Sequence, residues 1–216
     1  MKFKAALFDL DGTLLDTIDD LADSMNTVLK KFGFPRHEVE KYKYFVGDGM
    51  DVLVKKALPE SCRDEELVFR CIHAMKEEYS LHWADKTRPY SGIPELLDAF
   101  TSEGIKISIL SNKPHDPTKA VVSIMLAKWK FEMVVGVKEG VPKKPDPAAA
   151  IGIANNLGIL PLDFLYIGDT HTDMKTAVAA GMFPVGALWG FRTGEELIKA
   201  GARILVKNPA DLLRFI

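Results

Sequence analysis

Short apolar runs alternate with amphipathic segments along most of this chain. The first run covers residues 3–9 and ends in acidic residues and a glycine, the pattern of a buried strand that leaves a sheet. Similar runs recur at residues 105–110, 133–137, 164–167, 184–188 and 204–206. Helical patterns separate them at residues 94–102, 117–127, 147–157 and 173–180. This alternation predicts an α/β fold, a doubly wound (Rossmann-like) parallel sheet with helices on both faces.

The alternation breaks between Asp16 and about His82, where the periodicity is helical. A first helix there repeats apolar residues at three- and four-residue spacings from Ile18 and meets Gly33, which is suited to end it. The roughly 65 residues between the first two strands far exceed an ordinary crossover. We therefore expect a core domain of residues 1–15 and 83–216 and an inserted α-helical domain of residues 16–82. The alternative is that these helices lie directly on the sheet.

Composition and charge narrow the classes of partner. The 216 residues carry 28 Lys and Arg against 30 Asp and Glu, so no overall field favours nucleic acid or an anionic membrane surface. The apolar run after Lys4 is too short for a signal peptide, and glycines and a proline interrupt the uncharged stretch at residues 176–191. We expect a cytoplasmic monomer or homodimer that binds neither nucleic acid nor membrane.

Acidic residues follow two of the predicted strands. Asp9 and Asp11 stand where the first strand ends, and Asp169 and Asp173 follow the run at residues 164–167. The carboxyl ends of strands near a topological switch point line the ligand crevice of such a sheet. Four carboxylates gathered there would repel one another, so a hard divalent cation such as Mg²⁺ is predicted with them. The alternatives are a capped turn after Asp9 and, for Asp173, a first-turn residue favoured by the helix dipole.

Two other segments offer groups that bind anions. Ser111 and Asn112 follow the run at residues 105–110, where hydroxyl, amide and backbone N–H groups can bind phosphate oxygens. Lys143 and Lys144 precede Pro145 in a stiff turn before a helix. The alternatives are a helix N-cap for the first segment and a solvated lysine pair for the second.

Together these segments resemble the motifs of haloacid dehalogenase-superfamily hydrolases, and the similarity covers nearly the whole chain. Residues 8–16 resemble the first motif, Ser111–Asn112 the second, Lys144–Pro145 the third and residues 168–173 the fourth. Members with a helical cap carry it between the first and second motifs, where the helical segment lies. The resemblance also implies the sheet order 3-2-1-4-5, which places the first and fourth strands side by side.

The resemblance implies a role for each motif residue. Asp9 would attack phosphorus to give an aspartyl-phosphate, and Asp11 would protonate the leaving alkoxide and later activate water. Phosphoryl oxygens would be bound by Ser111, Asn112 and Lys144. The implied Mg²⁺ ligands are the Asp9 carboxylate, the Asp11 backbone carbonyl, Asp169 and Asp173, the last directly or through water.

Three stretches resemble phosphoglycolate phosphatases: residues 45–49, 88–93 and 189–197. In the first, Gly47, Asp48 and Gly49 would shape a cap loop that faces the substrate, the alternative being a plain interhelical turn. Dehalogenases lack a second acid at the position of Asp11. Sugar-phosphate mutases tend to carry a branched apolar residue at the position of Thr13. A threonine at this position is similar to the phosphatases of the superfamily.

We therefore expect a Mg²⁺-dependent phosphatase that hydrolyses a small phosphorylated metabolite, a phosphomonoester similar to phosphoglycolate. Alternative enzymes are a β-phosphoglucomutase-like sugar phosphomutase and a pyrophosphatase or nucleotidase of the same superfamily. A phospho-aspartate signalling module and a catalytically silent binding protein are the alternatives outside enzymes.

Overall fold

The computed structural model describes residues 3–215, and the chain divides into two compact units. One unit comprises residues 1–15 and 89–216, and the other comprises residues 16–88. The chain passes between them in two short strands that pair with each other, β2 (Leu15–Asp16) and β3 (Arg88–Pro89). The helical unit extends past the predicted end at residue 82, because the backbone N–H groups of Lys86 and Thr87 donate to the buried Asp20 carboxylate.

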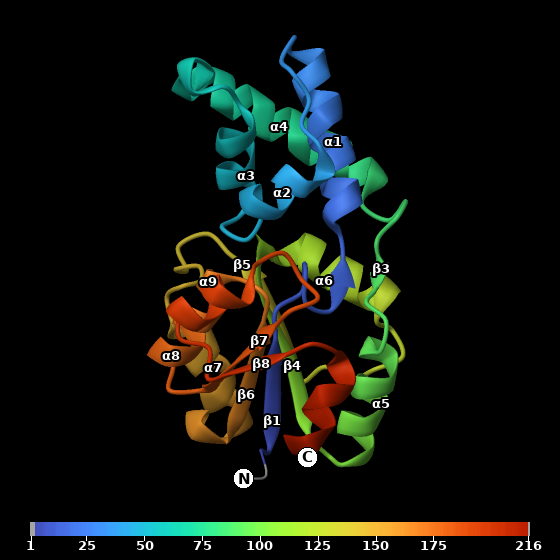
Figure 1. Cartoon of the computed structure of the whole chain (residues 1–216), viewed down its shortest axis with the longest axis vertical. Helices are drawn as coiled ribbons and strands as arrows, with labels where there is room; N and C mark the ends of the chain where they lie inside the picture. The colour runs from blue at the N-terminus through green and yellow to red at the C-terminus, as the bar shows by residue number, and fades with distance from the viewer. Residues whose placement is uncertain (1–2, 216) are drawn as a thin grey trace. The chain divides into compact units, whose positions relative to one another are not determined.

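The larger unit is built on a six-stranded parallel sheet of order β5-β4-β1-β6-β7-β8 (Figure 1). Its strands are β1 (Ala5–Phe8), β4 (Lys106–Pro114), β5 (Met133–Val137), β6 (Phe164–Gly168), β7 (Phe183–Ala187) and β8 (Ile204–Val206). The predicted fold class is confirmed, and the predicted order of the first five runs agrees with the sheet. The run at residues 204–206 adds a sixth strand at the edge.

Strand β1 shows why these runs are continuously apolar. All four of its residues are buried, because helices cover both faces of the sheet. Ala5 and Leu7 belong to a core cluster with residues of α7 and α8, whereas the Phe8 ring lies 6.0 Å from that of Phe100 in α5. The helices of this unit are α5 (Ile93–Ser102), α6 (His115–Met125), α7 (Ala148–Leu157), α8 (His171–Ala179) and α9 (Gly194–Lys199), with 3₁₀ turns η2 (Pro161–Asp163) and η3 (Pro209–Phe215).

Strand β4 is longer than the apolar run that predicted it. It continues through Ser111, Asn112 and Lys113 to Pro114, so these polar residues stand in the strand and not in a loop after it. Its pairing with β5 becomes irregular between Leu110 and Pro114. Polar side chains can be buried at this strand end because they form hydrogen bonds there, as Ser111 and Lys113 do.

The smaller unit consists of α1 (Ile18–Lys31), α2 (Val39–Phe45), α3 (Met50–Ala57), the 3₁₀ turn η1 (Glu60–Cys62) and α4 (Glu65–His82). Gly33 follows α1 with φ +79°, and its N–H donates to the carbonyl of Lys30. Gly47 and Gly49 lie between α2 and α3, also at positive φ, and Asp48 pairs with Lys56 at 3.1 Å. Among the described helices, no stretch combines the length and hydropathy that crossing a bilayer requires.

Candidate active site

Two neighbouring strands each end in a buried aspartate. Phe8 of β1 pairs with Ile167 of β6, and one step further the N–H of Asp9 donates to the carbonyl of Ile167 at 2.9 Å. Asp169 directly follows β6 and is completely buried. The parallel register therefore delivers one carboxylate from each strand to the same edge, as the sequence predicts.

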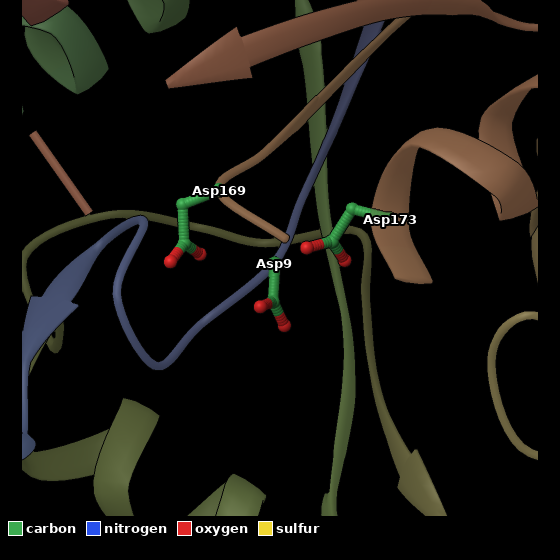
Figure 2. A group of neighbouring side chains, drawn as sticks. All are labelled: Asp9, Asp169 and Asp173. Atoms are coloured by element: carbon green, nitrogen blue, oxygen red, sulfur yellow. The ribbon is translucent and has the colours of Figure 1, made fainter. Parts of the chain in front are cut away.

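A third carboxylate comes from the first turn of α8. Thr170 is the N-cap of this helix, and Oδ2 of Asp173 accepts hydrogen bonds from its N–H at 3.0 Å and its Oγ1 at 2.6 Å. Asp173 is thus both a capping residue and part of the acidic cluster. One ligand atom from each of Asp9, Asp169 and Asp173 lies within 4.8 Å of the other two (Figure 2).

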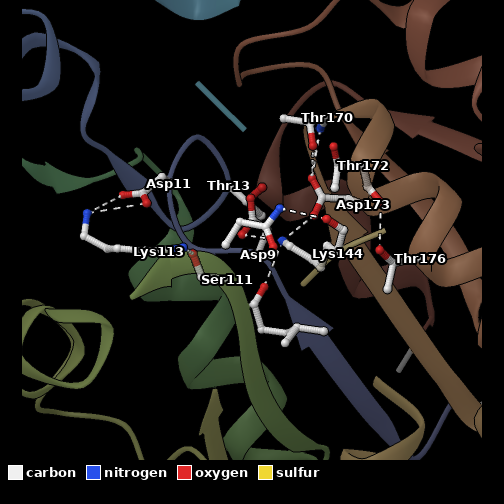
Figure 3. A network of polar contacts seen from close by, with 12 residues as sticks. Asp9, Asp11, Thr13, Ser111, Lys113, Lys144, Thr170, Thr172, Asp173 and Thr176 are labelled. Carbon is white, nitrogen blue, oxygen red and sulfur yellow. Dashed lines mark hydrogen bonds and ion pairs between the residues drawn. The ribbon is translucent and has the colours of Figure 1, made fainter. Parts of the chain in front are cut away.

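Lys144 provides positive charge beside these acids. Its Nζ donates to Oδ1 of Asp9 at 2.8 Å, to Oδ1 of Asp173 at 2.6 Å and to the carbonyl of Leu110 at 2.9 Å (Figure 3). These three contacts use all three N–H donors of an ammonium group. The carbonyl of Lys144 accepts from the Asn112 amide at 3.1 Å, so this loop is tied to the end of β4. Lys144 is buried, which excludes the solvated lysine pair as its description.

Two other segments of the chain bind the Asp169 carboxylate, and the sequence pattern did not predict these contacts. Its Oδ1 accepts from Oγ1 of Thr13 and its Oδ2 accepts from the N–H of Phe191, both at 2.8 Å. The indole N–H of Trp189 donates to the carbonyl of Thr13 at 2.9 Å, which links these two segments. Both segments lie in stretches that were recognised by their resemblance to known families. The contacts themselves could not be predicted, because neither a backbone N–H nor a single threonine forms a pattern along the sequence.

The buried acids have perturbed proton affinities. Burial, followed by the neighbouring charge of Asp173, raises the pKa of Asp169 to about 7. Burial and Asp173 also raise the pKa of Asp9 well above its ordinary value, while the Lys144 ammonium acts in the opposite direction. Burial disfavours the charged form of Lys144, but Asp173 and Asp9 outweigh it and raise the pKa of the lysine. The lysine therefore stays charged, while burial and mutual repulsion favour protonation of Asp9 and Asp169 unless a further cation is bound.

This donor set fits a hard divalent cation. Asp9 and Asp173 share the single Lys144 ammonium group, whereas Asp169 accepts from a hydroxyl and a backbone N–H. One positive charge does not compensate three carboxylates, and carboxylate oxygens are the ligands that Mg²⁺ prefers. Asp9 and Asp169 offer oxygens to such an ion. Asp173 accepts three hydrogen bonds, one of them from the Lys144 ammonium group, which suits it to orient the other groups.

The remaining predicted residues are not among the three clustered acids. The Asp11 carboxylate is turned to Lys113, whose Nζ lies 3.1 Å from Oδ1, and it is not among the three clustered acids. The metal contact predicted for Asp11 involves its backbone carbonyl and stays a prediction. Ser111 is buried, and its Oγ accepts from the N–H of Lys113 at 3.1 Å. Gly47, Asp48 and Gly49 belong to the helical unit, where their contact with a substrate stays a prediction.

Comparisons with known proteins agree with this geometry. The sequence profile of the family described as "Haloacid dehalogenase-like hydrolase" matches residues 6–187. Phosphoglycolate phosphatase 1 of Pseudomonas aeruginosa is 29% identical over 97% of this chain and 78% of its own length. The phosphoglycolate phosphatase of Aquifex aeolicus is 29% identical over 99% of this chain and 96% of its own length.

A solved structure extends the likeness to three dimensions. The crystal structure of a Lactobacillus delbrueckii subsp. bulgaricus protein is similar with a TM-score of 0.93 and 30% sequence identity, covering 99% of this chain and 98% of that one. The profile match spans the sheet from β1 to β7 and includes every residue of the acidic cluster. The chain therefore belongs to the haloacid dehalogenase-like hydrolase family.

Proposed function

We propose that this protein is a Mg²⁺-dependent phosphatase that hydrolyses a small phosphomonoester through an aspartyl-phosphate on Asp9. The observation that carries the proposal is the contact of Lys144 with Asp9, beside Asp169 and Asp173 at the edge of the sheet. A carboxylate with a fixed position and one oxygen engaged by a cation is suited to nucleophilic attack by its other oxygen.

In the first half-reaction an oxygen of Asp9 attacks phosphorus, and the bond from phosphorus to the leaving oxygen breaks. Asp11 gives its proton to that oxygen, so the alcohol leaves neutral. In the second half-reaction water attacks phosphorus and gives a proton to Asp11. The bond from phosphorus to Asp9 then breaks, which releases inorganic phosphate and regenerates both carboxyl groups.

The surrounding residues bind and orient the phosphoryl group. Ser111 and Asn112 contribute hydroxyl and amide donors to its oxygens. Lys144 contributes an ammonium donor by exchanging one of its contacts with Asp9, Asp173 and the Leu110 carbonyl for a phosphoryl oxygen. Mg²⁺, when bound by Asp9, Asp169 and the Asp11 carbonyl, with Asp173 in support, would offset the charge on the phosphoryl oxygens. The helical unit acts as a cap, whose loop of Gly47, Asp48 and Gly49 contacts the rest of the substrate.

The substrate class follows from relatives and not from the site alone. The similar proteins of P. aeruginosa and A. aeolicus are both named phosphoglycolate phosphatases. We therefore propose a small phosphorylated carboxylic acid similar to phosphoglycolate as the substrate.

A phosphate-release assay tests this function. The substrates are phosphoglycolate, a hexose 1-phosphate, a nucleoside monophosphate and pyrophosphate, each with Mg²⁺ or with EDTA. We expect phosphate release that requires Mg²⁺, is fastest for phosphoglycolate and is lost in Asp9→Asn. Turnover in that variant would contradict the mechanism, and conversion of the hexose 1-phosphate to an isomer would indicate a mutase instead.

A further inference from the structure

Asp11 and Lys113 form an ion pair that stands apart from the acidic cluster. Nζ of Lys113 lies 3.1 Å from Oδ1 and 3.4 Å from Oδ2 of Asp11, so one ammonium group spans both oxygens. The lysine side chain is 6% exposed and that of the aspartate 14%. Figure 3 shows this pair to one side of the network around Asp9, Lys144 and Asp173. Lys113 and Lys144, which are both buried, therefore contact different predicted catalytic carboxyl groups.

The backbone around Lys113 is fixed from both sides. Its N–H donates to Oγ of Ser111 at 3.1 Å, and its carbonyl accepts from Oγ1 of Thr118 in α6 at 3.2 Å. Gly136 of the neighbouring strand β5 packs so closely that an added Cβ would lie 2.6 Å from the Lys113 carbonyl oxygen. The ammonium group therefore extends from a rigid strand end.

The turn that carries Asp11 is equally constrained. Gly12 has φ +90°, a conformation that favours glycine, and its N–H donates to the carbonyl of Leu15 at 2.8 Å. A side chain at Gly12 would overlap the Asp169 carboxylate and the Phe191 ring. What the turn leaves free is rotation of the Asp11 side chain itself. Lys113 restrains that rotation.

We propose that Lys113 is a positioning residue, which holds the Asp11 carboxyl group in the orientation from which it gives its proton to the leaving oxygen. The inference rests on the proposed function, in which Asp11 is the general acid. A protonated carboxyl group has one carbonyl oxygen that still accepts a hydrogen bond from Lys113, while its O–H is directed elsewhere. The lysine can thus orient the acid without taking part in the proton transfer.

The test separates this role from phosphate binding and from folding. The variant is Lys113→Met, and kcat/KM is measured for phosphoglycolate and for 4-nitrophenyl phosphate. This ratio covers the steps up to departure of the leaving group, and nitrophenolate leaves without help from an acid. We expect a loss of about tenfold or more for phosphoglycolate and less than about threefold for 4-nitrophenyl phosphate.

Matched variants sharpen the result. Lys113→Arg keeps a cation and is expected to recover much of the phosphoglycolate activity. Lys119→Met removes an exposed lysine of α6 and is expected to leave both substrates unaffected. If Lys113→Met does not fold, Lys113→Gln, which keeps a polar donor, gives the same comparison. Equal losses for both substrates in the folded variant would overturn the proposal.

A second set of variants tests the role of Asp11 separately from the role of Lys113. Asp11→Asn alone should reproduce the loss specific to phosphoglycolate, and adding Lys113→Met to it should cost nothing more. If Asp11→Asn shows no such preference, the role of Asp11 in the proposed function falls and this inference with it. If Asp11→Asn shows the preference and Lys113→Met does not, only this inference is overturned.

Discussion

The ammonium group of Lys144 lies 2.8 Å from Oδ1 of Asp9, and both side chains are almost completely buried. The same ammonium group is 2.6 Å from Oδ1 of Asp173. Lys144, which lies in the loop before α7, thereby neutralises part of the negative charge of Asp9 and Asp173. Because one ammonium group contacts both carboxylates, we expect the stability of the site to depend strongly on Lys144.

Lys144→Met is expected to lower the free energy of unfolding at neutral pH by about 3–5 kcal/mol, because it leaves two buried carboxylates without their ammonium partner. Urea unfolding in EDTA measures the change. Lys144→Met combined with Asp173→Asn should recover part of the loss, and Lys143→Met, at an exposed position, should be close to neutral. Wild-type stability in Lys144→Met would show that the ion pair contributes little.

Stability of the metal-free protein should depend on pH through Asp169. Its pKa is about 7 in the folded protein against an ordinary 3.8, so between these values the folded state holds a proton that the unfolded state has lost. The contribution of Asp169 to stability therefore falls as pH rises from about 4 to 7, by about 1.4 kcal/mol per pH unit. Asp9 acts in the same direction.

Mg²⁺ should reverse this effect, because it binds the ionised carboxylates. Thermal unfolding at pH 5 and pH 8, with EDTA or with Mg²⁺, is the measurement. We expect Mg²⁺ to raise the Tm more at pH 8 than at pH 5, and we expect Asp169→Asn to reduce the pH dependence in EDTA. An equal Mg²⁺ shift at both pH values would argue against a site made of these acids.

Gly190→Ala should disturb the metal site. A Cβ at this position would overlap the Asp169 side chain and the carbonyl oxygen of Gly12. We expect weaker Mg²⁺ binding by calorimetry and a stability loss of about 1–3 kcal/mol. The matched control is Gly152→Ala in α7, whose Cβ would meet nothing within 4 Å. That control should be neutral or stabilising by up to about 1 kcal/mol, and equal effects of the two changes would refute the argument.

Thr13→Val should weaken Mg²⁺ binding by about tenfold or more, because it removes the hydroxyl that orients Asp169 while keeping the side-chain shape. Thr13→Ser keeps the donor and is expected to bind Mg²⁺ almost as the wild type does. Calorimetric titration of the three proteins compares them directly. Identical affinities in the valine variant and the wild type would show that the threonine does not orient the metal ligand.

The sequence by itself determined the class of fold and, to within one residue, where β1 and β6 end. Runs such as residues 3–9 are apolar throughout because helices bury both faces of the sheet, and this requirement is local enough to be visible in the pattern. The acidic residues Asp9 and Asp169 are likewise visible because each directly follows such a run. The motif spacing then indicated a shared site, although the polar extension of β4 through Pro114 escaped the apolar pattern.

Only the tertiary structure decided which charged groups are partners. Lys144 and Asp9 are 135 positions apart in the chain, and Lys113 and Asp11 are 102 apart, so no local spacing relates them. The order of the strands and the depth of burial set these pairings. Burial also sets their strength, because charges removed from water interact more strongly and shift each other's proton affinities.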